Sequence, residues 1–449
     1  MNFAQFSAAA AEYAKAQHIT DYELYYQANS SDQLGFFGGE VDRFSSSSLE
    51  GVCLRCLIDG KMGTASTESF TEEEIPALFA SAMESARYSG SEEKQSFYTG
   101  GEYQPVAAAE KPENDTAAEI AMMTQTEQLA LQADARIQKG VRASLADISK
   151  KTAISNSSGL YLESEGAMSV AFAGVVAKDE NGKRYTDRAV STALSGNGHE
   201  VGKMVVRAVE KTVSQIGAAP VPSGHYPVIF DNSQMTAMLE IFQSVFSAQE
   251  AQNGLSLLKG KVGEQIASDA VTLIDDPFYK DNFFKSPFDG EGVPTKPKTV
   301  IENGTLKTLL HNRATAAKDG VESTGNAYRA GYASPVSIAP FTFYMQPSET
   351  TREELMRKVG TAVMITFMKG AHAGANAVTG DFSLESKGYL IENGKIVRPV
   401  EEITVAGNFY QMLKDIVAVA DDLQVNIEDG ASCCGAPSVL VRDLAIAGC

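Results

Sequence analysis

The chain has 449 residues, a hydrophobic fraction of 43% and a formal net charge of −19. This length is enough for two or three domains, each with its own hydrophobic core. Lysine and arginine are dispersed without a basic run, so we expect no direct binding of nucleic acid, which requires clustered positive charge. No apolar run approaches the roughly 20 residues of a membrane-spanning helix, and the N-terminus lacks the basic start of a signal peptide. We therefore expect a cytoplasmic protein without a membrane partner.

The first half of the sequence predicts an N-terminal α+β region over 1–217, with sub-parts at about 1–89 and 113–217. Apolar residues at helical spacing predict the four helices 2–17, 71–88, 114–134 and 199–216. Alternating residues predict short antiparallel strands within 22–66 and 141–194. The turns between strands are expected at 29–32, Gly38-Gly39, Asp59-Gly60 and Asn181-Gly182. The order helix, strands, helix occurs twice, which is compatible with a structural duplication.

Residues 218–224, Ala-Ala-Pro-Val-Pro-Ser-Gly, are predicted to form a linker, because prolines and glycine disfavour regular structure. The remainder, 225–449, predicts a β-rich C-terminal domain with turns at Asn303-Gly304 and Asn393-Gly394. Two helices are predicted to interrupt the strands, at 351–359 and 408–423.

The segment 232–277 stands out within the C-terminal part. Its first half predicts a helix whose apolar face is formed by Met235, Met238, Leu239, Phe242, Val245 and Phe246. A glycine-rich connector follows, and then an alternating strand over 270–274 that Asp275-Asp276-Pro277 closes.

The cysteines do not describe a disulfide scaffold, because there are only five in a long chain: Cys53, Cys56, Cys433, Cys434 and Cys449. Cys53 and Cys56 lie in a strand pattern without a second Cys/His pair at zinc spacing, which favours two buried thiols over a metal half-site. Cys434, beside Cys433 and Gly435, is a candidate nucleophile or ligand, although no His or Arg neighbours it in sequence. A buried cysteine pair is the favoured interpretation.

Histidine offers no metal motif. The five histidines are His18, His199, His225, His311 and His372. None of them lies within helical or turn spacing of another, and the His-Glu-x-x-His and His-Glu-x-x-x-His patterns are absent. Two carboxylate clusters, at 275–276 and 289–291, do not follow the spacing of a calcium loop, and we interpret both as turns at strand ends.

Several separated blocks resemble one known family. The blocks SLEGVCLRCLIDGKMGTAST, GLSLLKGKVGEQIASDAVTLIDDP, SPFDGEGVPTKPKTVIENGTLKTLLHNRATAAKDGVESTGNAYR and NAVTGDFSLESKGYLIENGKIVRPVEEITVAGNFYQMLKDIVAVADDL are similar to the TldD/PmbA family and occur in the family order. Thr-Gly-Asp-Phe-Ser at 379–383, Ser-Thr-Gly-Asn at 323–326 and Ala-Gly-Asn at 406–408 resemble its PmbA (TldE) branch.

The resemblance also implies an absence. TldD-type members carry a His-Glu-x-x-x-His metal motif in the helix before the glycine-rich connector, and a C-terminal cysteine completes their metal site. The corresponding positions here fall within 246–253, where Glu250 is the only acidic residue and no histidine exists. Cys434 lies near the C-terminal cysteine, but one thiolate does not hold a zinc ion. The resemblance therefore implies that this chain binds no metal and that zinc belongs to a TldD-type partner.

The family fold implied is α+β, with helices on antiparallel strands followed by a β-rich, barrel-like C-terminal domain. The implied function is a PmbA/TldE-type subunit of a cytoplasmic metallopeptidase that degrades small or unfolded peptides. Such a chain would form a hetero-oligomer with its partner, or a homodimer when isolated. Candidate peptide-groove or interface residues are Asn326, Asp381, Phe382, Ser383 and Asn408. Strand-end turns are an equally good interpretation of each.

Two other functions stay open at this point. One is a peptide-binding or scaffold homodimer without catalytic activity. The other is an autonomous hydrolase that uses Cys434 together with a distant His372 or Asp381.

Overall fold

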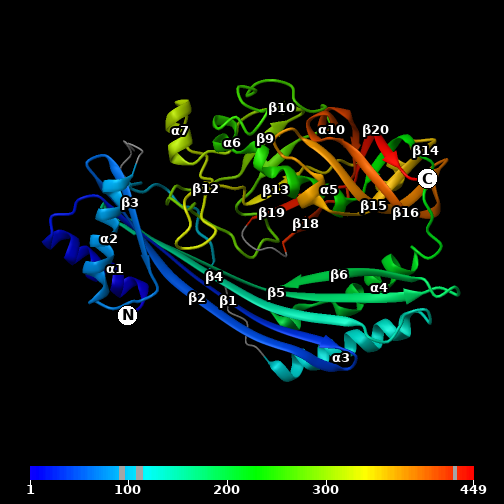
Figure 1. Ribbon diagram of the computed structural model, residues 1–449, viewed down its shortest axis with the longest axis horizontal. Helices are drawn as coiled ribbons and strands as arrows, with labels where there is room; N and C mark the ends of the chain where they lie inside the picture. The colour runs from blue at the N-terminus through cyan, green and yellow to red at the C-terminus, as the bar shows by residue number, and fades with distance from the viewer. Residues whose placement is uncertain (90–96, 108–114, 428–431) are drawn as a thin grey trace.

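The computed structural model describes residues 1–89, 97–107, 115–427 and 432–449. Its N-terminal region is built on one antiparallel sheet in the order β3-β2-β1-β4-β5-β6. The strands are β1 (Tyr22–Phe37), β2 (Glu40–Ile58), β3 (Lys61–Thr67), β4 (Arg142–Asn156), β5 (Tyr161–Lys178) and β6 (Arg184–Ala193). Helices α1 (Phe3–Ala16) and α2 (Glu74–Tyr88) pack on one end of this sheet, and α3 (Thr116–Ala133) and α4 (Val201–Val213) pack on the other (Figure 1).

The two halves of this region have the same order of elements, one helix, three strands and one helix. They join through the central antiparallel pair of β1 and β4, which extends from Glu23 opposite Asn156 to Phe37 opposite Arg142. Each half therefore supplies three strands of a single sheet, and the predicted helix and antiparallel-sheet region is confirmed.

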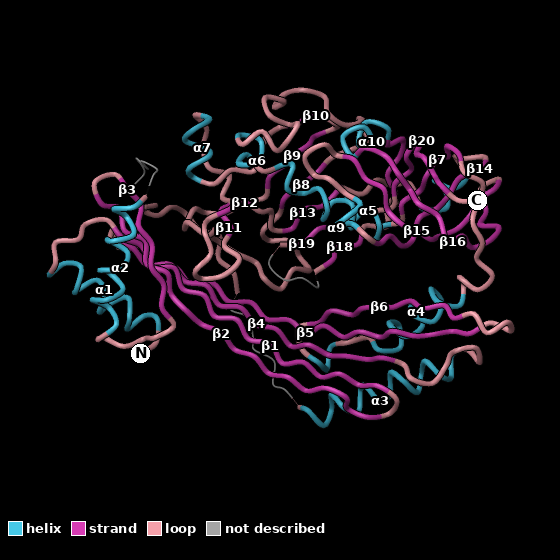
Figure 2. Tube along the Cα trace, in the orientation of Figure 1, coloured by secondary structure: helices cyan, strands magenta, loops and turns pink. Residues whose placement is uncertain are grey.

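The predicted turn at 29–32 is wrong, because β1 continues through these residues without a break (Figure 2). Their backbone pairs with β2 on one side and with β4 on the other, as in the register Ser30 opposite both Ser48 and Ser149. Hydrogen bonding to two neighbouring strands outweighs the local preference of Asn, Ser and Asp for turns. The strands predicted in the first part are accordingly fewer and longer than expected.

The C-terminal domain contains a five-stranded barrel. Its strands are β7 (Gly224–Phe230), β14 (Thr361–Lys369), β15 (Asp381–Glu392), β16 (Lys395–Asn408) and β20 (Val439–Ala447). Pairing of β16 with β20, for example Val405 opposite Ile446, closes the barrel. The expected barrel-like, β-rich domain is thereby confirmed.

A second sheet lies beside the barrel in the order β10-β9-β8-β13-β19-β18. Its strands are β8 (Leu273–Asp275), β9 (Lys298–Glu302), β10 (Thr305–Leu306), β13 (Thr342–Met345), β18 (Gln424–Asn426) and β19 (Cys433–Ala436). The remaining elements are β11 (Ala327–Tyr328), β12 (Ser337–Ile338), β17 (Ile416–Val419), α6 (Ala248–Gln252), α7 (Arg313–Asp319), α8 (Arg352–Arg357), α9 (Ala371–Gly374) and α10 (Phe409–Asp415).

Helix α5 (Asn232–Phe242) and the following 3-10 turn η2 (Gln243–Phe246) pack against β14 and β19 in the domain core. The side chain of Asp231 caps α5 by accepting from the backbone N–H of Gln234 at 2.8 Å. All six residues of the predicted apolar face are buried. Phe242 stacks on Phe409 with ring centroids 4.5 Å apart. The helix predicted from periodicity is therefore confirmed.

Two elements of the C-terminal domain differ in extent from the sequence-based predictions. The helix predicted over 408–423 ends at Asp415, because Ile416–Val419 forms β17 and pairs with β20. Isoleucine and valine favour this extended, half-buried position. The strand predicted over 270–274 is Leu273–Asp275, so Asp275 lies within a strand and not in a turn beyond it.

Glycine at 388 is required by the barrel, whereas glycine at 202 is not. A Cβ atom at Gly388 would lie 1.8 Å from the carbonyl oxygen of Met364, while one at Gly202 in α4 would meet nothing within 4 Å. We expect Gly388→Ala to destabilise the protein by about 2 kcal/mol or more. The same change at Gly202 should stabilise it by up to about 1 kcal/mol, since alanine loses less backbone entropy. Thermal unfolding followed by circular dichroism measures both, and equal shifts would contradict the predicted barrel packing.

A candidate functional cleft between the two domains

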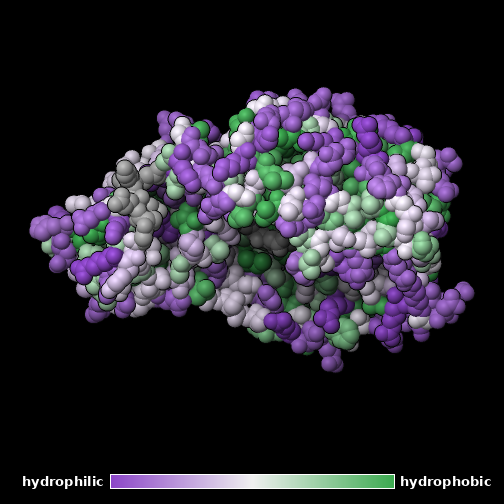
Figure 3. Space-filling model, turned by 45° about the horizontal axis from the view of Figure 1, so that its top comes forward, coloured by the Kyte–Doolittle hydropathy of each residue, from purple (hydrophilic) through white to green (hydrophobic). Residues whose placement is uncertain are grey.

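A cleft of about 840 Å³ lies between the N-terminal sheet and the C-terminal domain, a size typical of ligand sites. Figure 3 shows the surface hollowed at this place. One wall is the middle of the sheet and includes Gln27, Asn29, Ser31, Ser47, Ser48, Ser149 and Lys150. The opposite wall includes Glu240, Gln243, Ser244, Ser247, Tyr328, Ser337, Ile338, Ala339 and Pro340. Of the described lining residues, only Lys150 and Glu240 carry a charge.

The helical wall follows directly from the amphipathic pattern of α5 and η2. Glu240, Gln243, Ser244 and Ser247 are spaced at i, i+3, i+4 and i+7 and line the cleft. The apolar residues of the same segment face the core. Within the range 246–253, which is expected to correspond to the metal motif, Phe246, Ala248 and Ala251 are buried in the core while Ser247 lines the cleft. The cleft-facing positions begin at Glu240.

This wall does not fit a zinc ion. Zinc sites in proteins take three or four ligands from Cys, His, Asp and Glu, and the wall offers one carboxylate, one amide and two hydroxyls. The Glu240 carboxylate already accepts a hydrogen bond from Asn426 Nδ2 at 2.9 Å. Throughout the part of the chain that the structure describes, no group of three His, Cys, Asp or Glu side chains could hold a metal ion.

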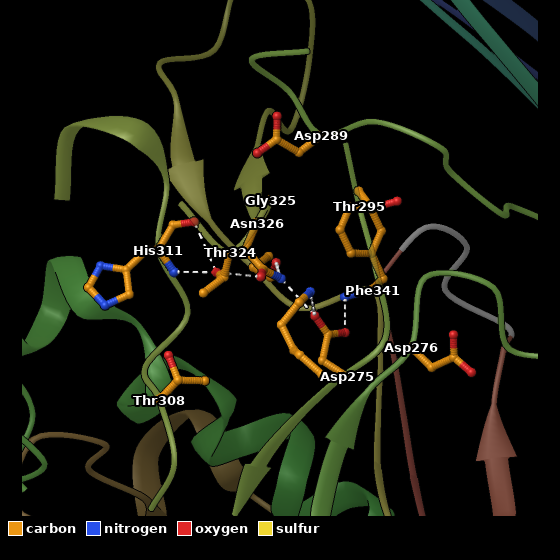
Figure 4. A network of polar contacts seen from close by, with 12 residues as sticks. Asp275, Asp276, Asp289, Thr295, Thr308, His311, Thr324, Gly325, Asn326 and Phe341 are labelled. Carbon is orange, nitrogen blue, oxygen red and sulfur yellow. Dashed lines mark hydrogen bonds and ion pairs between the residues drawn. The ribbon is translucent and has the colours of Figure 1, made fainter. Parts of the chain in front are cut away.

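A buried polar network fixes the loop that forms another part of the same wall (Figure 4). The Asp275 carboxylate accepts hydrogen bonds from the backbone N–H of Phe341 and from Asn326 Nδ2, each at 2.7 Å, and from Lys298 Nζ at 3.0 Å. Asn326 Nδ2 also donates to the carbonyl oxygen of Ala339 at 3.1 Å. Asp275, the last residue of β8, is therefore a buried anchor for 339–341, while Asp276 makes the expected strand-end turn by accepting a hydrogen bond from the Phe278 N–H at 2.8 Å. Asn326 is itself buried and supports this wall without being among the described residues that line the cleft.

A second buried network joins the two domains at one end of the cleft. Glu23 of β1 is fully buried, and its Oε1 accepts from Arg55 at 2.7 Å and from Arg329 of the C-terminal domain at 2.9 Å. The Arg329 guanidinium lies 4.2 Å from the centre of the Tyr25 ring. Arg55 lies 4.0 Å from the Glu291 carboxylate, also in the C-terminal domain. One buried carboxylate thus connects a cation from each domain.

Asp289 lies beside this network. Its carboxylate accepts hydrogen bonds from the backbone N–H groups of Glu291, Val293 and Ala327 at 2.9, 3.0 and 2.9 Å. The turn predicted at 289–291 is therefore confirmed for this residue. Burial first, and then the nearby charge of Glu291, raise the pKa of Asp289 to about 7.

The other predicted site residues lie elsewhere. At the start of α10, Asn408 Nδ2 donates to Asp381 Oδ1 at 2.9 Å, and Asn408 Oδ1 caps the helix by accepting from the Tyr410 N–H at 3.1 Å. Phe382 is buried and lies edge-on to Phe242, while Ser383 is exposed. These four residues of β15 and β16 are not among the described residues that line the cleft. As interface candidates they stay predictions.

The cysteines are placed as expected from their strand patterns. Cys53 and Cys56 are buried, and burial raises the pKa of Cys56 to about 12. Cys434 is buried within β19, whereas His372 and Asp381 are exposed. The structure therefore does not present the Cys434 thiol at the surface beside either side chain.

Comparison with known proteins identifies the family to which this architecture belongs. Models of the PmbA/TldA metallopeptidase match three segments, domain 1 at 22–86, the central domain at 109–216 and the C-terminal domain at 223–448. The chain belongs to the PmbA/TldD metallopeptidase family. The family recognised from the sequence blocks is thereby confirmed.

Among its relatives, this PmbA/TldD-family chain is 30% identical to the metalloprotease PmbA homolog of Haemophilus influenzae over 408 residues, 86% of this chain and 83% of that one. It is 27% identical to the metalloprotease PmbA of Escherichia coli O157:H7, over 91% of this chain and 88% of that one.

Two solved structures share the whole fold. A candidate modulator of a DNA gyrase from Thermotoga maritima has a TM-score of 0.90 and 33% identity, over 99% of this chain and 100% of that one. TldE from Thermococcus kodakarensis has a TM-score of 0.85 over 98% of this chain and 100% of that one. Because its sequence is only 22% identical, this comparison shows a shared fold alone.

Sequence reasoning missed the two charged residues of the cleft, Lys150 and Glu240. Neither belongs to a motif, and each becomes notable only because strand and helix bring them to facing walls. Likewise, Glu23 and Arg329 are 306 positions apart, so no local pattern relates them. The run of serines at 45–48 was the one visible signal of a polar wall.

The raised pKa of Asp289 predicts a pH dependence of stability. Because the unfolded pKa is near 3.9, the folded chain holds this proton more tightly, so the stabilisation is complete below about pH 4 and is lost as pH rises through about 7. The full effect is about 4 kcal/mol. Glu291→Gln removes the repelling charge and should flatten the dependence between pH 5 and 8.

Chemical denaturation at several pH values measures this dependence. The exposed carboxylate Glu349, changed to Gln, is the matched control and should leave the slope unchanged. Equal slopes in the wild type and in Glu291→Gln would contradict the contribution of the Glu291 charge, and a flat wild-type profile would show that the pKa of Asp289 is not raised.

Proposed function

We propose that this chain is a PmbA/TldE-type subunit of a metallopeptidase assembly, which contributes a peptide-binding cleft and no catalytic metal. The observation that carries the proposal is the cleft wall formed by α5 and η2, where Glu240 is accompanied only by an amide and hydroxyls. These groups form hydrogen bonds with a polypeptide but do not make a zinc site. In this proposal, zinc and its activated water are supplied by a TldD-type partner chain.

The walls of the cleft suit an extended peptide. Strands β11 and β12 form an isolated pair, and their residues Tyr328, Ser337 and Ile338 line the cleft. An extended segment can add to such a pair through main-chain hydrogen bonds, which favour unfolded peptides without demanding one sequence. The hydroxyl and amide groups of the facing sheet then contact peptide groups on the other side.

The proposed assembly is a hetero-oligomer with the TldD-type chain, and a homodimer when the partner is missing. We place it in the cytoplasm, where thiols such as Cys53 and Cys56 stay reduced. Among the described residues, no helix is both long and apolar enough to cross a membrane.

Zinc content and peptide hydrolysis test this division of roles. The isolated chain should carry far less than one zinc per chain and should not hydrolyse an unstructured fluorogenic peptide. Hydrolysis should appear with a TldD-type partner and should stop when a chelator removes the metal. Stoichiometric zinc together with chelator-sensitive hydrolysis by the isolated chain would overturn the proposal.

A cleft variant tests whether the peptide passes through this chain. Ser244→Trp fills the helical wall and should lower kcat/KM of the mixed assembly at least tenfold. The matched control is Ser81→Trp on the exposed side of α2. If the isolated chain binds peptide but never alters hydrolysis by the partner, the chain is a peptide-binding homodimer instead.

A further inference from the structure

Lys150 occupies an unusual place in β4. It pairs with Asn29 of β1 and Gly166 of β5, in the middle of the sheet. It lines both the cleft and a small adjoining cavity of about 70 Å³. The two spaces share Lys150, Phe284, Tyr328, Ala339 and Pro340, so the ammonium lies where the cleft passes into the cavity.

The charge of Lys150 is not compensated by the residues that the structure describes. Its ammonium makes no hydrogen bond or ion pair with them, and burial alone lowers the pKa of Lys150. Other lysines of the protein are paired with a carboxylate. Buried Lys298 binds Asp275 at 3.0 Å, and Lys151, the next residue along β4, lies 3.4 Å from Glu163. A partly buried ammonium without an anion costs folding free energy, which is a reason to look for an anionic ligand.

The adjoining cavity reinforces this positive character. Its charged lining residues are Lys150, Lys285, Arg329 and Asp289. Arg329 is neutralised by Glu23, while Lys285 Nζ donates only to the carbonyl oxygen of Lys280 at 3.1 Å among described partners. The one acid, Asp289, is held by three backbone N–H groups and carries a pKa of about 7. The lining of the cavity thus contains two lysines without a carboxylate partner among the described residues and one carboxyl group, which is held by backbone N–H groups and is partly protonated near neutral pH.

We propose that the Lys150 end of the cleft binds a carboxylate of the peptide, supplied by its C-terminus or by an acidic side chain. The ammonium would donate charge-assisted hydrogen bonds to the carboxylate, which are about twice as strong as neutral ones. This inference rests on the proposed peptide-binding function and adds a polarity to it. Lys150 marks the acidic end of the ligand, and the neutral remainder of the peptide runs along the serine-rich wall.

Fluorescence anisotropy of labelled ten-residue Gly/Ser/Ala peptides tests the proposal on the full chain. One peptide ends in a free carboxylate and a second in an amide. Two further amide-ended peptides carry a single internal Glu or Gln. The variants are Lys150→Met, which keeps the length but removes the charge, Lys150→Arg, which keeps the charge, and Lys151→Met as the adjacent control.

We expect the wild type, Lys150→Arg and Lys151→Met to bind at least one carboxylate peptide about tenfold more tightly than its neutral counterpart. Lys150→Met should abolish this preference while binding the neutral peptides unchanged. The free-carboxylate and internal-Glu pairs identify which source of carboxylate is recognised. Thermal unfolding should show that Lys150→Met is at least as stable as the wild type, because it removes an uncompensated charge.

Each other result overturns the inference. A carboxylate preference that persists in Lys150→Met assigns the site to other residues. Equal binding of acidic and neutral peptides by the wild type rejects carboxylate recognition but leaves the proposed peptide cleft standing. If no peptide binds the isolated chain, both the inference and the peptide-binding role of this chain fail.

Discussion

The buried carboxylate of Glu23 is the contact on which the geometry of the cleft depends. An isolated buried carboxylate is costly, and Glu23 meets that cost by binding Arg55 from its own sheet and Arg329 from the C-terminal domain. Because the Glu23 carboxylate accepts hydrogen bonds from one arginine of each domain, it helps to fix how the C-terminal domain lies over the sheet. Removal of Arg329 would leave the domains joined by other ion pairs, such as that of Lys387 with Asp187, and by packing such as that of Phe284 against Gly166. The cleft is therefore a consequence of a specific ionic contact and not only of two apolar surfaces meeting.

Asp275 has a similar supporting role within the C-terminal domain. It is another fully buried carboxylate, and it uses one lysine, one asparagine and one backbone N–H to hold the loop that carries Ala339 and Pro340 into the cleft. Buried charges that are paired act as rigid supports, because displacement would leave an unpaired group in a low-dielectric interior. Ionic networks behind the two walls thus help to position them, in addition to hydrogen bonds made by cleft-lining residues such as Glu240.

The sequence was sufficient for features set by local chemistry. The apolar face of α5, its Asp231 cap and the positive-φ turns at Asn303-Gly304 and Asn393-Gly394 all follow from residue spacing and backbone preference. It was insufficient where distant partners decide the outcome. Residues 29–32 form a strand because β2 and β4 flank them, and Ile416 leaves its helix because β20 pairs with it. The cleft could not be predicted for the same reason, since its charged residues Lys150 and Glu240 belong to different domains.

The chemistry of the helical wall supports the proposed binding of peptide without a metal ion in this chain. Glutamine and serine at 243, 244 and 247 preserve a polar, hydrogen-bonding face, while the apolar side of the same helix still fills the core. Hydroxyls and amides do not make a zinc site, but they supply hydrogen-bond donors and acceptors for a peptide backbone. A wall of leucine or valine would have closed the cleft by apolar packing. The retention of polar residues on a face that holds no metal ligand set is therefore the strongest argument that this surface contacts polypeptide, with the chemistry assigned to a second chain.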